Sequence, residues 1–199
     1  MELLSLKKML YHDLGLPDPK TRRKMLCDEM DALSDKQIHC LNCTGTCCTM
    51  SANSMQITPL EAFEIIQSLA LTAETVNAIK DELRTNIRNY RLDHEIFLGK
   101  KSHHFLRKTY TCPFFSPGPK GCTIKKELKP YGCLGFNPRI EGDNGSQCHS
   151  DFDLLQKRED PMLILEAEAN DYLKNKFELT WNKCEIPKAV LALLDNLFK

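Results

Sequence analysis

The sequence has no excess of charge of either sign. Its 27 lysine and arginine residues balance 27 aspartate and glutamate residues, and the isoelectric point is near 7.0. No window carries a long basic run. Proteins that bind nucleic acid usually present a basic patch that neutralises phosphates. We therefore expect neither DNA nor RNA as a partner.

Long apolar runs are also missing. No stretch reaches the roughly 18 to 20 uncharged residues that a membrane-spanning helix needs. The N-terminal stretch MELLSLKKMLYHDLGL has Glu2 at its start, Lys7 and Lys8 inside its apolar run, and no small-residue cleavage site, so it does not resemble a secretory signal. These absences predict a protein that neither crosses a membrane nor is exported, and that resides in the cytoplasm.

Cysteine, in contrast, is abundant: the chain has ten, and four of them fall within the stretch CLNCTGTCC. In a reducing cytosol, clustered cysteines are more often metal-binding or catalytic than disulfide-bonded. A chain of this length can bury roughly 70% of its unfolded surface, so it needs no covalent staples. Disulfides remain an alternative, but the clustering favours a metal site.

A second cysteine region, CPFFSPGPKGCTIKKELKPYGC, begins at Cys112. Its proline and glycine turns fold the chain back between Cys112 and Cys122. Joining Cys48 to Cys112 closes a loop of about 64 residues, which costs roughly 4 kcal/mol, whereas a structural zinc site contributes roughly 10 to 16 kcal/mol. The two regions therefore predict two halves of one chelate, with these ligands: Cys40, Cys43, Cys47, Cys48, Cys112, Cys122 and Cys133.

The metal itself is left open by these residues. One tetrahedral zinc ion takes four thiolates, and an iron-sulfur cluster also takes four. Soft thiolate ligands suit either. Cys47 and Cys48 point in different directions unless the chain turns sharply, so they more naturally serve two metal atoms. We expect iron, as an iron-sulfur cluster, with Zn²⁺ as the alternative.

The same cysteines carry a resemblance to a known family, the YkgJ-like proteins with a CxxCxxCC cysteine cluster, described as zinc- or iron-chelating. The resemblance spans about residues 40–138 and includes the segment from Ile57 to Glu61 after the cluster. The second region matches through its cysteines and their neighbours: Cys112-Pro113-Phe114, Cys122-Thr123-Ile124, Pro130, Cys133 and Phe136. The resemblance implies a metal-binding core over this range and adds Cys148 as an eighth candidate ligand.

The sequence departs from the family pattern at three points. Three residues, not two, separate Cys43 from Cys47, and Lys129-Pro130 and Cys133-Leu134 stand where the family has Arg-Pro and Cys-Arg. Relatives with this module include flagellin lysine methylases, which implies S-adenosylmethionine and a protein lysine as an alternative function. A purely structural zinc module is a further alternative. The chain shows no glycine-rich nucleotide fingerprint, so whether it is an enzyme is left open.

Hydrophobic periodicity predicts a mainly α-helical α+β fold in a single domain, 1–199, with helical extensions on both sides of a cysteine-rich core over 40–138. Thr58, Pro59 and Glu61 predict a helix start with a capping box. A strand or hairpin arm is expected over 105–110, and buried, non-ligating roles are expected for Cys27 and Cys184. Helices are predicted over the following ranges: 20–33, 73–92, 161–176 and 187–198.

Overall fold

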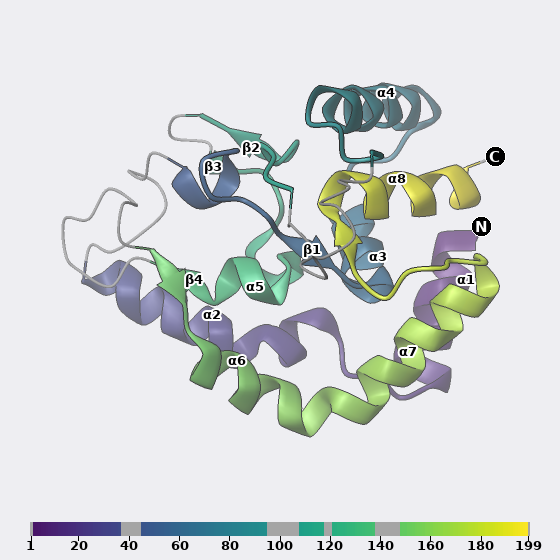
Figure 1. Ribbon diagram of the computed structural model, residues 1–199. Helices are drawn as coiled ribbons and strands as arrows, with labels where there is room; N and C mark the ends of the chain where they lie inside the picture. The colour runs from purple at the N-terminus through teal and green to yellow at the C-terminus, as the bar shows by residue number, and fades with distance from the viewer. Residues whose placement is uncertain (1, 37–44, 95–107, 118–120, 138–147, 199) are drawn as a thin grey trace, which may run out of the picture.

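The structure is a computed structural model that describes residues 2–36, 45–94, 108–117, 121–137 and 148–198. Its elements are mostly helices, with short helical turns marked η (Figure 1). In chain order they are α1 (Glu2–Lys8), η1 (Met9–Asp13), α2 (Pro19–Asp35), η3 (Thr46–Cys48), β1 (Gln56–Ile57), α3 (Pro59–Ser68), α4 (Ala73–Asn89), β2 (Phe115–Ser116), β3 (Gly121–Cys122), η4 (Lys126–Leu128), α5 (Tyr131–Leu134), β4 (Phe136–Asn137), β5 (His149–Ser150), α6 (Phe152–Glu159), η5 (Asp160–Met162), α7 (Leu163–Lys176), β6 (Cys184–Glu185) and α8 (Ile186–Leu197).

Three long helices begin at side-chain caps that the sequence supplies. Asp18 accepts hydrogen bonds from two backbone N–H groups in the first turn of α2, at 2.9 and 3.1 Å. Thr58 and Glu61 form a capping box at the start of α3, and Thr72 caps α4. Such caps satisfy N–H groups that have no partner within the helix. The predicted helix starts at Thr58 and Thr72 are confirmed.

The apolar core is centred on α8, which packs between α3 and α4 (Figure 1). Apolar residues at helical spacing line the buried face of α8, among them Val190 and Leu194. Helix α3 is buried on nearly all sides because α7 packs against it as well. Leu6 and Leu10 from the N-terminal segment belong to the same cluster of buried side chains. The first and last helices therefore share one core.

The strands pair as three short antiparallel ladders: β1 with β6, β2 with β3, and β4 with β5. The strand predicted over 105–110 does not form in its described part, residues 108–110. Tyr110 instead donates its backbone N–H to the oxygen of Asn53 at 2.9 Å. Over residues 108–110 the strand prediction was wrong, because the hydrogen bonds of Tyr110 join it to Asn53, Met55 and Ile186 and not to a neighbouring strand. Residues 105–107 lie outside the described ranges.

Charged side chains are buried where α2 meets α3. Arg22 and Arg23 are 2% and 0% exposed, and both guanidinium groups donate to the carboxylate of Glu64, which is also fully buried. Arg22 Nε donates to the backbone oxygen of Pro17 at 2.8 Å, and Arg23 Nε donates to that of Lys129 at 2.7 Å. Buried charges require such pairing, because an unpaired charge in the interior is costly.

Tyr131 connects α5 to the same network. Its hydroxyl donates to Glu166 Oε1 at 2.5 Å, and Arg22 Nη1 donates to the hydroxyl oxygen at 2.5 Å. Arg158 donates to Glu166 Oε2 at 2.5 Å and lies 3.4 Å from the centre of the Tyr131 ring. The backbone N–H of Tyr131 donates to Glu61 Oε1 at 2.9 Å. We call this network the charged junction: Arg22, Arg23, Glu61, Glu64, Tyr131, Arg158 and Glu166.

The predicted mainly helical fold with a few short strands is confirmed. In the described ranges, no helix combines the length and the apolar character that crossing a bilayer would require. The charged junction fixes residues 129–131 in place through backbone and side-chain contacts. It therefore positions the end of the second cysteine region.

Candidate metal centre

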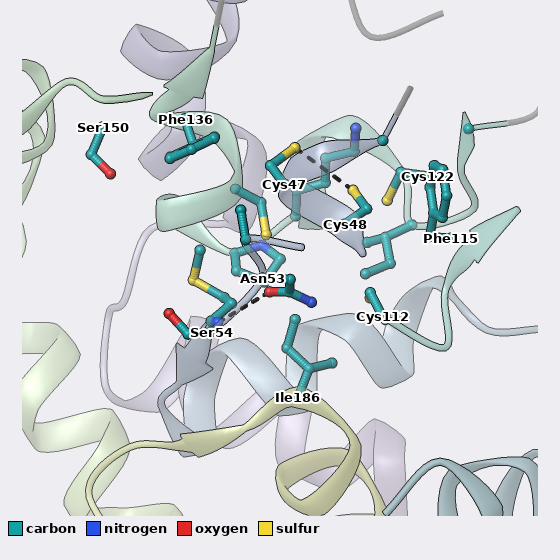
Figure 2. Close-up of a pocket in the computed structure, with 18 of the residues that line it drawn as sticks. Cys47, Cys48, Asn53, Ser54, Cys112, Phe115, Cys122, Phe136, Ser150 and Ile186 are labelled. Atoms are coloured by element: carbon teal, nitrogen blue, oxygen red, sulfur yellow. Dashed lines mark hydrogen bonds between the residues drawn. The ribbon is translucent and has the colours of Figure 1, made fainter. Parts of the chain in front are cut away.

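Five of the predicted ligand cysteines line one cavity of about 180 Å³. They come from three stretches that lie far apart in the sequence: η3, the β2–β3 hairpin with its preceding residues, and α5. Figure 2 shows the sulfur atoms of Cys47, Cys48 and Cys122 around the same part of the cavity. The lining cysteines are Cys47, Cys48, Cys112, Cys122 and Cys133. The fold thus brings the two cysteine regions together.

Cys47 and Cys48 lie on η3, a tight turn that begins at Gly45. Gly45 has a φ of 76°, in the left-handed region, and its oxygen accepts the Cys48 N–H at 2.7 Å. A Cβ at Gly45 would lie 2.2 Å from the ring of Phe115, so a larger side chain does not fit. This turn leaves the two sulfur atoms only 3.9 Å apart. The sequence argument that adjacent cysteines serve separate metal atoms therefore does not apply to this turn.

Backbone hydrogen bonds hold Cys112 against the first cysteine region. Its N–H donates to the oxygen of Cys48 at 2.8 Å. Nearby, the hydroxyl of buried Tyr110 donates to the oxygen of Met55 at 2.6 Å and accepts the first backbone N–H of α8 at 3.0 Å. Residues 48–55, the segment around Cys112 and the core helix α8 are therefore fixed to one another.

The β2–β3 hairpin carries Cys122 back toward Cys112. Cys122 pairs with Phe115 across the ladder, and the Phe115 N–H donates to the oxygen of Cys112 at 3.1 Å. The predicted return of the chain between these two cysteines is confirmed by the pairing on either side of residues 118–120, which lie outside the described ranges. Cys133 reaches the cavity from α5, where its N–H donates to the oxygen of Pro130 at 3.0 Å.

Burial makes ionisation of these thiols unfavourable. Burial raises the pKa of Cys112 to about 12, and burial together with neighbouring thiols raises the pKa of Cys133 well above its ordinary value. The pKa of Cys47 is raised by its contact with Cys48 and by burial. Lys129 acts in the opposite direction on all three thiols. These thiols are protonated at neutral pH, so a metal must displace their protons.

The rest of the cavity wall is mainly apolar. Aromatic and aliphatic side chains line it, and the thioethers of Met30 and Met55 add two more sulfur atoms. The few polar groups include Lys129 and the side chain of Asn53, which is 4% exposed. In the part of the chain that the structure describes, neither a histidine nor a carboxylate belongs to the wall. The donor set is therefore soft, which suits zinc, copper(I) or iron-sulfur chemistry and not magnesium or calcium.

The remaining predicted ligands are Cys40, Cys43 and Cys148. Cys40 and Cys43 lie outside the described residues and stay predictions from the sequence. Cys148 immediately precedes β5 and is half-buried. Ser150 of that strand lines the cavity, but Cys148 does not.

Cys27 and Cys184 do not line the cavity either. Cys184 is buried, and burial raises its pKa to about 11, whereas Cys27 on α2 is half-buried. The buried position of Cys184 agrees with the packing role that the sequence predicted, whereas Cys27 is less buried than predicted. Each is a natural control for experiments on the cavity thiols.

The cavity is not closed into a finished chelate. Among the described residues, no three cysteine, histidine or carboxylate side chains lie close enough together to hold a metal ion without movement. Within the same described ranges, the close sulfur–sulfur contact is that of Cys47 and Cys48, at 3.9 Å. A loaded site therefore requires that further thiols move toward this pair or join it from the undescribed residues.

Sequence reasoning missed three features of this region. Asn53 and Lys129 line the cavity, but neither belongs to a recognisable ligand motif. The charged junction was also missed. Arg22 and Arg23 lie in the helix predicted over 20–33, and nothing in the local sequence indicates that their charges are buried. One signal was present for Lys129: it stands next to Pro130 in the turn before Cys133.

Comparison of the chain with protein-family models, curated proteins and solved structures finds no match. The resemblance to the YkgJ-like cysteine-cluster proteins therefore stays a prediction from the cysteine spacing, and the case for a function rests on the geometry of the cavity.

Proposed function

We propose that this chain is a metal-binding protein that holds iron, as an iron-sulfur cluster, or zinc through the cysteines of this cavity. One observation carries the proposal: five thiols from three separate stretches line the same small, mainly apolar cavity. Cysteine is often buried as a small apolar residue, but packing alone does not call for five cysteines around one cavity.

The geometry of η3 supports the proposal. In a tetrahedral zinc site with Zn–S bonds near 2.3 Å, two ligand sulfur atoms lie about 3.8 Å apart. The sulfur atoms of Cys47 and Cys48 lie 3.9 Å apart, close to this spacing. This pair therefore supplies two ligands in place, and the remaining thiols complete the set by shifts of their side chains.

The second half of the site comes from Cys112, Cys122 and Cys133. Cys112 and Cys133 interact electrostatically with each other, with Cys122 and with Cys47. Cys40 and Cys43 join them as ligands predicted from the sequence. This number of thiols exceeds the four that one zinc ion or one iron-sulfur cluster takes, so the others bind a second ion or stay in reserve.

A redox or electron-transfer role follows if the metal is iron. An iron-sulfur cluster supplies one-electron chemistry, and the apolar wall and hydrogen bonds to sulfur set its reduction potential. With zinc, the same cysteines are a structural clamp between the two cysteine regions. The methylase alternative stays a prediction from the resemblance, because no observed contact favours it over metal binding.

The proposal is tested with serine variants at three cysteines. Cys48→Ser and Cys122→Ser each remove a cavity thiol, and we expect both to lower the metal bound per chain. Cys27→Ser is the matched control, because Cys27 does not line the cavity. Metal content is measured by elemental analysis of protein purified without oxygen. Equal metal content in all three variants would contradict the proposal.

A further inference from the structure

Asn53 is the polar side chain of the cavity that is fixed most firmly. It is 4% exposed and lines the cavity. Its backbone N–H donates to the oxygen of Thr49 at 2.8 Å, and its backbone oxygen accepts from Tyr110 at 2.9 Å. The side-chain Oδ1 accepts the Met55 N–H at 3.1 Å, which is an Asx turn. These three bonds fix both the position of Asn53 and the orientation of its amide.

The amide nitrogen is left facing the cavity. Because Oδ1 is held by Met55, Nδ2 points the other way, and Figure 2 shows it turned toward Cys112. Within the described residues, Nδ2 makes no hydrogen bond, and it is not fully buried, so it borders the open space of the cavity. A ligand that fills this space and excludes water must therefore leave an acceptor within reach of Nδ2, or the donor loses its hydrogen bonds to water.

The acceptors that this wall offers are mostly sulfur. Apart from Asn53, the polar wall side chains besides the cysteines are Ser54, Ser150 and Lys129. A neutral thiol accepts hydrogen bonds weakly, whereas a thiolate on a metal is a charged acceptor and forms a stronger bond. Metal binding therefore converts the thiols around Nδ2 from weak hydrogen-bond acceptors into strong ones.

We infer that Asn53 is a positioning residue of the metal site, whose Nδ2–H donates to a metal-bound thiolate, with Cys112 or Cys48 as its acceptor. This inference rests on the proposed metal site. A hydrogen bond to sulfur draws electron density from the thiolate, which stabilises the loaded site and raises the reduction potential of bound iron. Groups that support metal ligands in this way typically contribute about 10- to 100-fold to metal affinity.

Two variants test the Nδ2 donor separately from the Asx turn that Oδ1 forms with the Met55 N–H. In Asn53→Asp, a carboxylate oxygen can still accept the Met55 N–H, but the donor is gone and a negative charge is added. In Asn53→Ser, the hydroxyl can still accept that N–H, but it is too short to reach a ligand sulfur. Asn86→Asp is the matched control, because Asn86 Nδ2 donates to the oxygen of Thr111 at 2.9 Å and does not line the cavity.

The experiment measures Zn²⁺ affinity by competition with a chromophoric chelator, and the sulfur-to-metal charge-transfer band of the Co²⁺-loaded protein. We expect Asn53→Ser to bind Zn²⁺ about tenfold more weakly and Asn53→Asp up to about 100-fold more weakly. Both should shift the Co²⁺ band to lower energy, because the thiolate keeps more electron density. Asn86→Asp should leave the band in place even if the fold is less stable.

Two results overturn the inference, and they are distinguishable. In the first, the wild-type protein binds both ions, and Asn53→Asp and Asn53→Ser match it in affinity and in band position. This result would exclude the role of Asn53 but leave the proposed metal site. Wild-type protein that takes up neither ion removes the proposed metal site as well. If Asn53→Asp does not fold, Asn53→Ser decides the question by itself.

Discussion

Two buried regions of this molecule lie side by side and differ in how their polar groups are satisfied. In the charged junction, Glu64 accepts hydrogen bonds from Arg22 and Arg23, and the Tyr131 hydroxyl accepts a further one from Arg22. In the cavity, whose wall includes Pro130 and Cys133 on either side of Tyr131, the polar groups are mainly thiols that face an open space. One region is complete within the chain, and the other is not.

This difference distinguishes polar groups that are buried for stability from polar groups that are buried at a binding site. The junction carries positive and negative side chains in a network that satisfies nearly every described polar atom; Arg23 Nη1 and Arg158 Nε are exceptions. Both of these guanidinium groups lie against the Tyr131 ring, at 4.3 and 3.4 Å from its centre. The described cavity thiols have weaker partners: Cys47 and Cys48 contact each other, and Lys129 is the cationic side chain of the wall. This is why we assign the ligand to the cavity.

The largest effect on stability should come from breaking the junction. Glu64→Gln removes the carboxylate that faces Arg22 and Arg23 and leaves two buried guanidinium groups without their counter-charge. We expect a loss of roughly 3–5 kcal/mol in the free energy of unfolding, measured by urea titration. Lys24→Ala, which breaks an exposed ion pair with Asp28, is the control and should change stability little. Similar losses in both variants would show that the junction is not a structural centre.

Acidification should have the largest effect on metal binding. Cys47, Cys112 and Cys133 all have raised pKa values, so each is protonated at neutral pH and releases its proton to a metal. If all three ligate, affinity falls by about a thousandfold for each pH unit between 8 and 6, because each displaced proton contributes a factor of ten. A chelator competition series measures this, and a pH-independent affinity would exclude these thiols as ligands.

The metal-free protein should respond to pH in another range. The pKa of Cys112 is raised from 9.0 to about 12 in the folded state, so the folded protein holds this proton more tightly than the unfolded chain. The stability from this group is fully present below pH 9 and is lost as the pH rises toward 12. Between pH 6 and 8 it should therefore contribute no change in the free energy of unfolding.

The turn at Gly45 offers a sharper test of the cavity. Gly45→Ala would make a methyl group clash with the Phe115 ring and would force alanine into the left-handed backbone conformation. We expect a loss of about 1–3 kcal/mol in the free energy of unfolding and weaker metal binding. Gly121→Ala is a matched control: Gly121 has a φ of 53°, but its Cβ would meet nothing within 4 Å. The difference between the two, from thermal unfolding and metal content, isolates the contact with Phe115. Equal effects would mean that the turn does not depend on this ring.

The smallest effect should come from Lys129, the lysine of the cavity wall. It lowers the pKa of nearby thiols and partly offsets the negative charge of several thiolates on one metal. Lys129→Gln should weaken Zn²⁺ binding severalfold, and less so at high salt, because the side chain is half-buried and partly screened. Lys125→Gln, at an exposed position, provides the comparison. An unchanged affinity in Lys129→Gln would remove this electrostatic contribution.

Local signals in the sequence predicted the helices well. Thr58 with Glu61, and Thr72, start helices where the structure has them, because caps act within a single turn. Turn residues between Cys112 and Cys122 likewise predicted a return of the chain that the β2–β3 pairing confirms. Helix α6 was not predicted, since its short span with exposed Phe152 has little apolar periodicity.

Long-range contacts were less accessible. The pairing of Arg22 with Glu64, and the position of Asn53 beside the thiols, depend on segments that only the tertiary fold brings together. The sulfur atoms of Cys47 and Cys48 lie 3.9 Å apart because Gly45 adopts a left-handed conformation and the chain turns sharply there. The sequence contains this glycine but does not specify its conformation.

Elemental analysis with an ultraviolet-visible spectrum, on protein purified without oxygen, tests the central claim most directly. The account predicts either iron with acid-labile sulfide and a broad absorption near about 400 nm, as thiolate-ligated clusters show, or colourless protein with zinc at about one or two equivalents. In both cases the metal should fall in Cys48→Ser and Cys122→Ser. Wild-type protein that carries neither iron nor zinc above the level of these variants would contradict it.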